Sequence, residues 1–204
     1  MTMLRKLFGP SKKEIWQQLA KETGAEFQPG RFWKGDRVQA THGEWTMTLD
    51  TFVVSTGKTT VIFTRLRAPY VNPDQFRFTI YRRGLFSELG KLLGMQDIEV
   101  GHPDFDRDFI IKGTDAGKLR ALFSNARLRE LITLQPRIHL TVKDHDGWFG
   151  KAFPPDTDEL CFHVVGVIKD VARLAQLFEL FAETLDHLCR IGSAYERAPG
   201  VQLE

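Results

Sequence analysis

Cysteine is scarce in this chain of 204 residues, which contains only Cys161 and Cys189. Two cysteines cannot build the dense disulfide framework of a small secreted domain, and their spacing matches no zinc-binding motif. A chain of this length buries enough apolar surface to fold without crosslinks. Because both cysteines lie in strongly apolar stretches, we expect reduced thiols in the core of a cytoplasmic protein.

Long apolar runs and an imbalance of charge are absent as well. No stretch approaches the roughly 18 uninterrupted apolar residues of a membrane span, so we expect no transmembrane segment. Residues 1–8 are too few for the apolar region of a signal peptide, which again favours a cytoplasmic location. The formal net charge of +2 is too small to indicate a polyanionic partner. We find no internal repeat and no low-complexity segment.

Phenylalanine, in contrast, is abundant, with 16 residues that indicate a core of large flat side chains or a wide apolar binding surface. Alternation of apolar and polar residues predicts extended segments. These expected segments are 45–50, 61–66, 76–81, 98–113, 138–142 and 159–168. The first three follow one another through short connections and predict an antiparallel β-meander. Segment 159–168 is almost entirely apolar, which is typical of a central strand covered on both faces.

Helical spacing fills the intervals between these strands. Four helices are expected, at 11–23, 84–95, 115–135 and 170–190. The first begins with a capping box of Ser11 and Glu14, and the last is a long amphipathic helix with more than one buried face. Because strands come in groups, we predict an α+β fold, with an antiparallel meander sheet packed by several helices.

The domain organisation follows from this order of elements. We expect residues 1–204 to form a single compact unit. If it has two lobes, the seam lies near 95–101. Gly192 ends the last helix, and the tail 193–204 is expected to be disordered.

Two phosphate- or metal-binding motifs fail on one residue each. Segment 55–59 has the tail of a nucleotide-binding P-loop, but Phe52 stands where the loop needs glycine, so a hairpin turn is expected. Four aspartates take positions one, three, five and twelve of a calcium loop, namely Asp104, Asp106, Asp108 and Asp115. Phe109 occupies the sixth position, where a sharp turn needs glycine. Phe105, Phe109 and Ile111 instead share one parity, so we interpret this segment as a half-buried strand.

Candidate catalytic groups also have simpler interpretations. Segment 144–146 with His139 could ligate a metal, but a solvated strand end explains the same residues. Cys161 and His163 share one face of a strand, as a nucleophile and its base would, yet a buried core cysteine is commoner. The sequence therefore predicts no catalytic residue, no metal ligand and no cofactor. A deep pocket in which His102, Asp106 and His139 converge would instead favour an enzyme.

Five arginines cluster around the second and third predicted strands: Arg65, Arg67, Arg77, Arg82 and Arg83. Interleaved aromatic residues suggest a single-stranded nucleic acid or an anionic surface as a partner. However, Phe76 and Phe78 alternate away from Arg77, and the segment lacks the RNA-recognition signature. We expect a solvated face there rather than a nucleic-acid site.

Two adjacent runs carry a resemblance to known proteins. Residues 90–101 read GKLLGMQDIEVG, residues 105–113 read FDRDFIIKG, and regularly spaced leucines follow. Over roughly residues 60–135 the chain resembles a group of uncharacterised bacterial proteins and, more weakly, a broader bacterial family with a domain of unknown function. The resemblance implies a bacterial cytoplasmic origin and no established activity. Some members of the broader family are membrane-anchored, and no catalytic residues carry over.

Segment 144–158 is the strongest candidate for a partner contact. Two glycines and two prolines prevent regular structure, yet the segment carries Trp148, Phe149 and Phe153. Exposing two such rings costs several kcal/mol at about 25 cal/mol per Å². Either the loop folds over its own core, or the rings meet a partner protein or a second subunit. In the second case Trp148 is the expected hot spot.

Taken together, these patterns leave the biochemical function unknown and favour a non-enzymatic binding or adaptor domain of a bacterial cytoplasmic protein. One alternative is an enzyme whose site is assembled from distant residues. The other is a weak nucleic-acid or anionic-surface binder.

Overall fold

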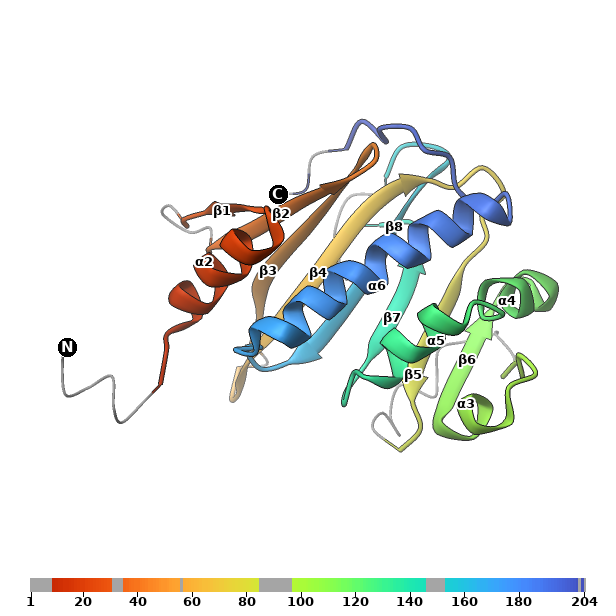
Figure 1. The fold of residues 1–204 in the computed structure, drawn as a ribbon, viewed down its shortest axis with the longest axis horizontal. Helices are drawn as coiled ribbons and strands as arrows, with labels where there is room; N and C mark the ends of the chain where they lie inside the picture. Colours follow the sequence, from red (N-terminus) through yellow and green to blue (C-terminus); the bar gives the residue numbers. More distant parts are fainter. Residues whose placement is uncertain are drawn as a thin grey trace.

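The computed structural model describes residues 9–30, 35–55, 57–84, 97–145, 153–201 and 203. Within these ranges, strands form one antiparallel sheet in the order β1-β2-β3-β4-β8-β7-β5-β6 (Figure 1). The strands are β1 (Glu26–Gln28), β2 (Arg37–His42), β3 (Trp45–Ser55), β4 (Thr60–Val71), β5 (Phe78–Arg82), β6 (Phe109–Gly113), β7 (His139–Lys143) and β8 (Thr157–Val165). The predicted central strand at 159–168 is confirmed, because β8 lies between β4 and β7 and is buried on both faces.

The described helices all cover the same face of this sheet (Figure 1). They are α2 (Lys12–Thr23), α3 (Pro103–Asp108), α4 (Ala116–Leu122), α5 (Ala126–Thr133) and α6 (Val171–Arg190). An antiparallel sheet with helices on one face and a long C-terminal helix is an α+β fold, as predicted. None of the described helices has the length and apolar character needed to span a membrane.

Helix α6 supplies the largest part of the cover. Its 20 residues span about 30 Å at 1.5 Å per residue, and it crosses β4 and β8 diagonally (Figure 1). Asp170 caps its start by accepting a hydrogen bond from the Arg173 amide. Its buried residues, as the apolar spacing predicts, are Leu174, Leu177, Phe178, Leu180, Phe181, Thr184, Leu185 and Leu188. The breadth of this set places α6 deep in the core.

Helix α2 also begins and ends as its sequence predicts. The Ser11 hydroxyl accepts from the Glu14 amide, and the Glu14 carboxylate accepts from the Ser11 amide. Gly24 ends the helix in the left-handed conformation, with φ of 72°. Trp16 is fully buried between this helix and the sheet.

The meander prediction holds for its first two runs, β3 and β4, but not for the third, and the sequence did not predict β1 and β2, which continue the antiparallel order on the other side of β3. The third run is β5, and β8 and β7 lie between it and β4. The edge of β4 from Thr64 to Val71 pairs with the apolar strand β8, which is distant in sequence. Strands that follow one another in the sequence often pair but need not do so, and here the more deeply buried strand β8 pairs with β4 in place of β5.

Two stretches differ from prediction in their local structure. The extended segment expected over 98–113 contains helix α3, because Pro103 starts a helix and Asp106 draws the preceding loop inward. The Asp106 carboxylate accepts hydrogen bonds from the amides of Val100, Gly101 and His102. The helix expected at 115–135 is two helices, and Asn125 caps the second by accepting from the Leu128 amide.

Some sequence predictions fall outside the described ranges. The helix expected at 84–95 lies almost wholly among residues 85–96, so it stays a prediction, as does the seam near 95–101. After α6, Ser193 and Ala194 are buried, and the Tyr195 amide donates to the Val71 carbonyl oxygen. The disorder expected for the tail 193–204 stays a prediction.

Candidate functional site

Charged side chains gather on the face of the sheet that points away from the helices. We call this the polar face. It comprises Asp50, Arg65, Arg67, His139, Lys143, Glu159, Cys161 and His163. The strand register brings them together, because Asp50 pairs with Arg65, Arg65 with His163, Arg67 with Cys161, and Lys143 with Glu159. Successive side chains of a strand alternate between faces, so these residues share one side.

Each cation of the polar face contacts a carboxylate. Arg65 binds Asp50 in a bidentate pair, with Nε–Oδ1 at 2.8 Å and Nη2–Oδ2 at 2.9 Å. Arg67 donates to the same carboxylate at 2.9 Å and lies 3.8 Å from Glu159. Lys143 Nζ lies 3.2 Å from the other Glu159 oxygen. Burial opposes the charge of Arg65, but Asp50, together with Cys161 and Glu159, more than offsets it, so the pKa of that guanidinium is raised.

Burial distinguishes this cluster from an ordinary charged surface. The side chains of Arg67 and Glu159 are 0% exposed, and that of Asp50 is 7% exposed. The prediction of a solvated arginine face is therefore wrong for Arg65 and Arg67. The reason is that the carboxylates of β3 and β8 neutralise both arginines, which makes their burial tolerable. Neither guanidinium is presented to solvent as a phosphate-binding surface.

A histidine pair lies beside these charges. The His139 and His163 rings are 4.4 Å apart between centroids. Burial, together with the nearby His163 and Lys143, lowers the pKa of His139 to about 3. Burial, Lys143 and Arg65 lower the pKa of His163 to about 4. Both rings are therefore neutral at pH 7.

Cys161 shares the face of His163, as its parity predicts. Burial, reinforced by the negative charge of Glu159, raises the pKa of its thiol to about 12. The thiolate is the nucleophilic form, and it is essentially unpopulated at neutral pH under such a shift. This pair therefore does not form an activated nucleophile and base, which agrees with the interpretation of Cys161 as a core cysteine. The described cysteines are unbridged.

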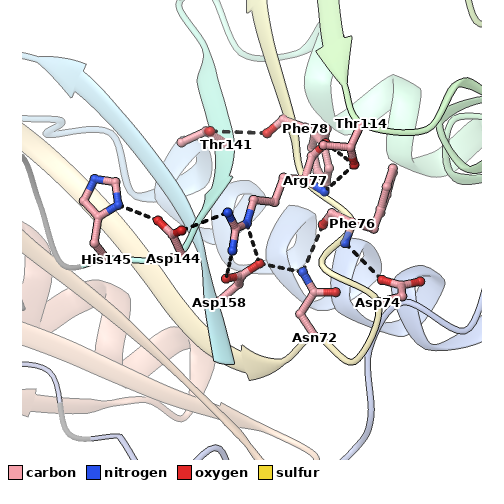
Figure 2. Close-up of polar contacts among 10 residues, drawn as sticks. All are labelled: Asn72, Asp74, Phe76, Arg77, Phe78, Thr114, Thr141, Asp144, His145 and Asp158. Carbon is pink, nitrogen blue, oxygen red and sulfur yellow. Dashed lines mark hydrogen bonds and ion pairs between the residues drawn. The ribbon is translucent and has the colours of Figure 1, made fainter. Parts of the chain in front are cut away.

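Arg77 is the centre of a second polar network (Figure 2). Its guanidinium donates to both oxygens of Asp158, at 3.0 and 3.1 Å, and lies 2.8 Å from Asp144. The hydrogen bond to Asp158 raises the pKa of Arg77, despite partial burial. On the far side of Asp158, Asn72 Nδ2 donates to Oδ2 at 2.6 Å. His145 completes the chain by contacting Asp144 at 2.7 Å.

This network holds the two ends of segment 144–158 together. Asp144 and Asp158 are the terminal residues of that segment, and Arg77 bonds to both. Backbone bonds add to the closure, since the Phe153 amide donates to the Asp144 carbonyl and the Asn72 amide to the Asp156 carbonyl. Contact with His145 is the main cause that lowers the pKa of Asp144, so this carboxylate stays charged at neutral pH.

The predicted contact residues of that loop are only partly visible. Phe153 is half-buried, while Trp148 and Phe149 lie outside the described residues. The predicted solvated strand end is correct for Asp144, whose side chain is 51% exposed, but wrong for His139, which is buried. Across the described part of the chain, no group of three or more histidine, cysteine or carboxylate ligands is placed to hold a metal.

Of the three residues whose convergence would have favoured an enzyme, His102 and Asp106 lie together but His139 lies elsewhere. Both carboxylate oxygens of Asp106 bind loop amides beside α3, whereas His139 packs on the polar face against His163 and Tyr81. The half-buried strand expected from Phe105, Phe109 and Ile111 is wrong at Phe105, which lies in α3, and correct at Phe109 and Ile111, which lie in β6. Two surface grooves have volumes of about 480 and 630 Å³: the first lies between α3 and α5, and the second between β2–β4 and residues 198–201 with Leu203. The first groove is lined by His102, and neither is lined by Asp106, Cys161, His139 or His163.

Sequence reasoning missed the carboxylate partners of the arginines. Asp158 and Glu159 open an otherwise apolar strand, and Asp50 ends an alternating one. A carboxylate in a strand that is covered on both faces needs a cation, and this signal could have indicated the arginines.

Comparison with known proteins identifies no family for this chain. No protein-family model matches the chain, and no curated protein matches it. Among solved structures, the chain is similar to the crystal structure of the mycobacterial trehalose monomycolate transport factor A, TtfA. The identity is 11%, the TM-score is 0.47, and the match covers 94% of this chain and 98% of that one.

Proposed function

We propose that this chain is a non-enzymatic binding or adaptor domain of the bacterial cytoplasm and that segment 144–158 is its contact element. The observation that carries the proposal is the Arg77 clamp, in which one guanidinium bonds to both ends of the segment. A loop whose ends are fixed loses less conformational entropy when its middle binds a partner. A clamp of this kind suits a recognition loop on a rigid sheet.

The chemistry of the polar face supports the same conclusion. Its arginines are neutralised by carboxylates, its histidines are neutral, and its thiol is protonated. The charged groups of this face pair with one another within the fold, so they supply no activated acid, base or nucleophile. Unbridged cysteines fit a reducing compartment.

The recognition groups in this proposal are the aromatic side chains of the loop. Tryptophan is enriched among residues that dominate binding energy, and Asp146 and Lys151, which flank Trp148 and Phe149 in the sequence, are polar residues of the kind found at the rim of an interface. Phe153 is half-buried at the base of the loop, beside the clamp. Trp148 is then the principal hot spot, with Phe149 as its neighbour.

The test is capture of binding proteins by the purified full-length chain, compared between variants. Trp148→Ala should reduce the yield of each specific partner at least tenfold, since hot-spot truncations cost about 2 kcal/mol or more. Tyr195→Ala is the matched control, because Tyr195 is an aromatic residue that is 55% exposed elsewhere on the surface. It should leave capture unchanged.

The stability of the Trp148→Ala variant shows whether a loss of capture comes from a lost partner contact or from unfolding. The proposal expects an unchanged melting temperature, because the ring contacts the partner. Unfolding of the variant, or equal capture by both variants, would show that the loop only covers its own core.

A further inference from the structure

The closed end of the β3–β4 hairpin is an apolar two-stranded arm. Four of the six large apolar side chains exposed in the described structure belong to this corner: Val53, Val54, Ile62 and Val165. Their exposed fractions run from 41% to 58%. Figure 1 shows the arm at the lower left of the sheet. An apolar cluster concentrated at one corner marks an interaction surface rather than random exposure.

One edge of the arm is open within the described residues. Strand β2 pairs with β3 only as far as Leu49, whereas β3 continues to Ser55. Beyond Leu49, the pairing of β3 is with β4 alone, from Asp50↔Arg65 to Ser55↔Thr60. Strand edges of this kind present backbone donors and acceptors that a further strand can pair with.

Within segment 51–55 itself protective charges are missing, and a described charge lies at its inner end, where Lys12 Nζ contacts Thr51 Oγ1 at 3.4 Å. Between Asp50 and Arg65 the only charged residue is Lys58, at the turn. Natural edge strands are commonly shielded by lysine, proline or inward-pointing charges, and segment 51–55 (TFVVS) has none of these. The turn itself is polar, whereas the apolar residues lie along both strands. A hairpin that inserts into a membrane would need apolar residues at its turn, so a strand that pairs with this edge is the better partner.

Symmetry identifies that strand. In a two-fold antiparallel pair centred on Val53, Phe52 faces Val54 of the second copy and Thr51 faces Ser55. Hydroxyl residues thus meet hydroxyl residues, and apolar residues meet apolar residues. A two-fold interface brings each patch against itself, so a charge near the axis would meet a like charge. The uncharged segment avoids this, and pairing centred on Val53 uses only the stretch that β2 leaves open.

We propose that the outer edge of β3 from Thr51 to Ser55 binds a second copy of this chain, and joins two sheets into one across a two-fold axis at Val53. The contact is small compared with the roughly 800 Å² per partner of a standard interface. The dimer is therefore expected to be weak and to form as the concentration rises. It is independent of the loop 144–158.

The first measurement is sedimentation velocity of the full chain over a concentration series. The wild-type protein should shift from monomer to dimer, and Val53→Lys should remain monomeric. Val53 is 58% exposed, so the variant is expected to fold, which its circular dichroism and melting curve verify. Leu134→Lys is the matched control: Leu134 is 47% exposed outside the arm, and this variant should dimerise like the wild type.

A charge-reversal pair tests the symmetry itself. Val53→Lys and Val53→Asp should each be monomeric, because the axis brings like charges together. An equimolar mixture should form a heterodimer, since opposite charges then face each other. A wild-type chain that stays monomeric, a Val53→Lys variant that still dimerises, or a mixture that does not associate would overturn the proposal. A dimer lost in Trp148→Ala and kept in Val53→Lys would place self-association on the loop instead.

Discussion

The two faces of the sheet are both buried in their central part, yet they are built from opposite chemistry. The helix-covered face is closed by apolar side chains such as Phe162, Leu160 and Phe181. The polar face buries Arg67 and Glu159 just as completely. The first face gains stability from removing apolar area from water, whereas the second must match every charge to tolerate burial. Charged residues on this face are therefore no evidence of a solvent-facing site.

The largest expected effect is on the apolar side. Phe181 is fully buried in α6, so Phe181→Ala should lower the free energy of unfolding by about 3–5 kcal/mol. Denaturant unfolding measures this loss. Leu134→Ala is the exposed control and should change stability by no more than about 0.5 kcal/mol. A Phe181→Ala variant that is as stable as this control would show that α6 is not the main core element.

A slightly smaller loss is expected on the polar face. Arg67→Met removes the cation between Asp50 and Glu159, and should cost about 3 kcal/mol, because buried carboxylates then lack part of their compensation. Adding Glu159→Gln to this variant should cost less than the sum of the single losses, by about 1–3 kcal/mol. Strict additivity of the two substitutions would contradict the pairing. Arg107→Met, on an exposed arginine paired with Asp104, should melt like the parent.

Acid should weaken the polar face before it affects the apolar face. The pKa values of His139 and His163 are about 3 and about 4 in the folded chain and 6.5 when unperturbed. A histidine with a lowered folded pKa stabilises the fold fully above 6.5, and this contribution is lost as the pH falls through 6.5 toward the folded value. The expected loss from pH 7 to pH 5 is roughly 2 kcal/mol per histidine.

Urea unfolding at pH 7, 6 and 5 measures this dependence. The His139→Gln, His163→Gln double variant should lose much of it over this window. Equal slopes in the wild type and the double variant would show that carboxylates or other groups cause the acid sensitivity.

The difference between the two faces of the sheet also explains which features could be predicted from the sequence. Apolar periodicity was sufficient for α2 and α6, because each buries a regular stripe, and an almost entirely apolar run was sufficient for the central strand β8, which is buried on both faces. Strand parity correctly placed Cys161 and His163 on one face. It could not show that this face is buried, since burial depends on strands that are far apart in the chain. The pairing of Arg77 with both Asp144 and Asp158 depends on the same long-range order, in which β8 and β7 separate β4 from β5.

The smallest expected effect concerns nucleic acid. Arg65 and Arg67 are committed to Asp50, and Arg77 to Asp158, so these arginines should give no specific site. A labelled single-stranded oligonucleotide should bind no tighter than the roughly 10⁻⁴–10⁻⁶ M of non-specific contacts at physiological salt. Much tighter binding that weakens steeply as salt is added would contradict the internal neutralisation of the arginines.

The account depends most on the claim that the polar face serves the fold and offers no activated catalytic group. NMR titration of the His139 and His163 ring protons tests it directly, with assignments from the single His→Gln variants. The account predicts that both rings are neutral at pH 7 and titrate below pH 5, whereas the denatured chain titrates near pH 6.5. A folded-state pKa near 6.5 for either ring would reveal a solvated base beside Cys161 and would contradict the account.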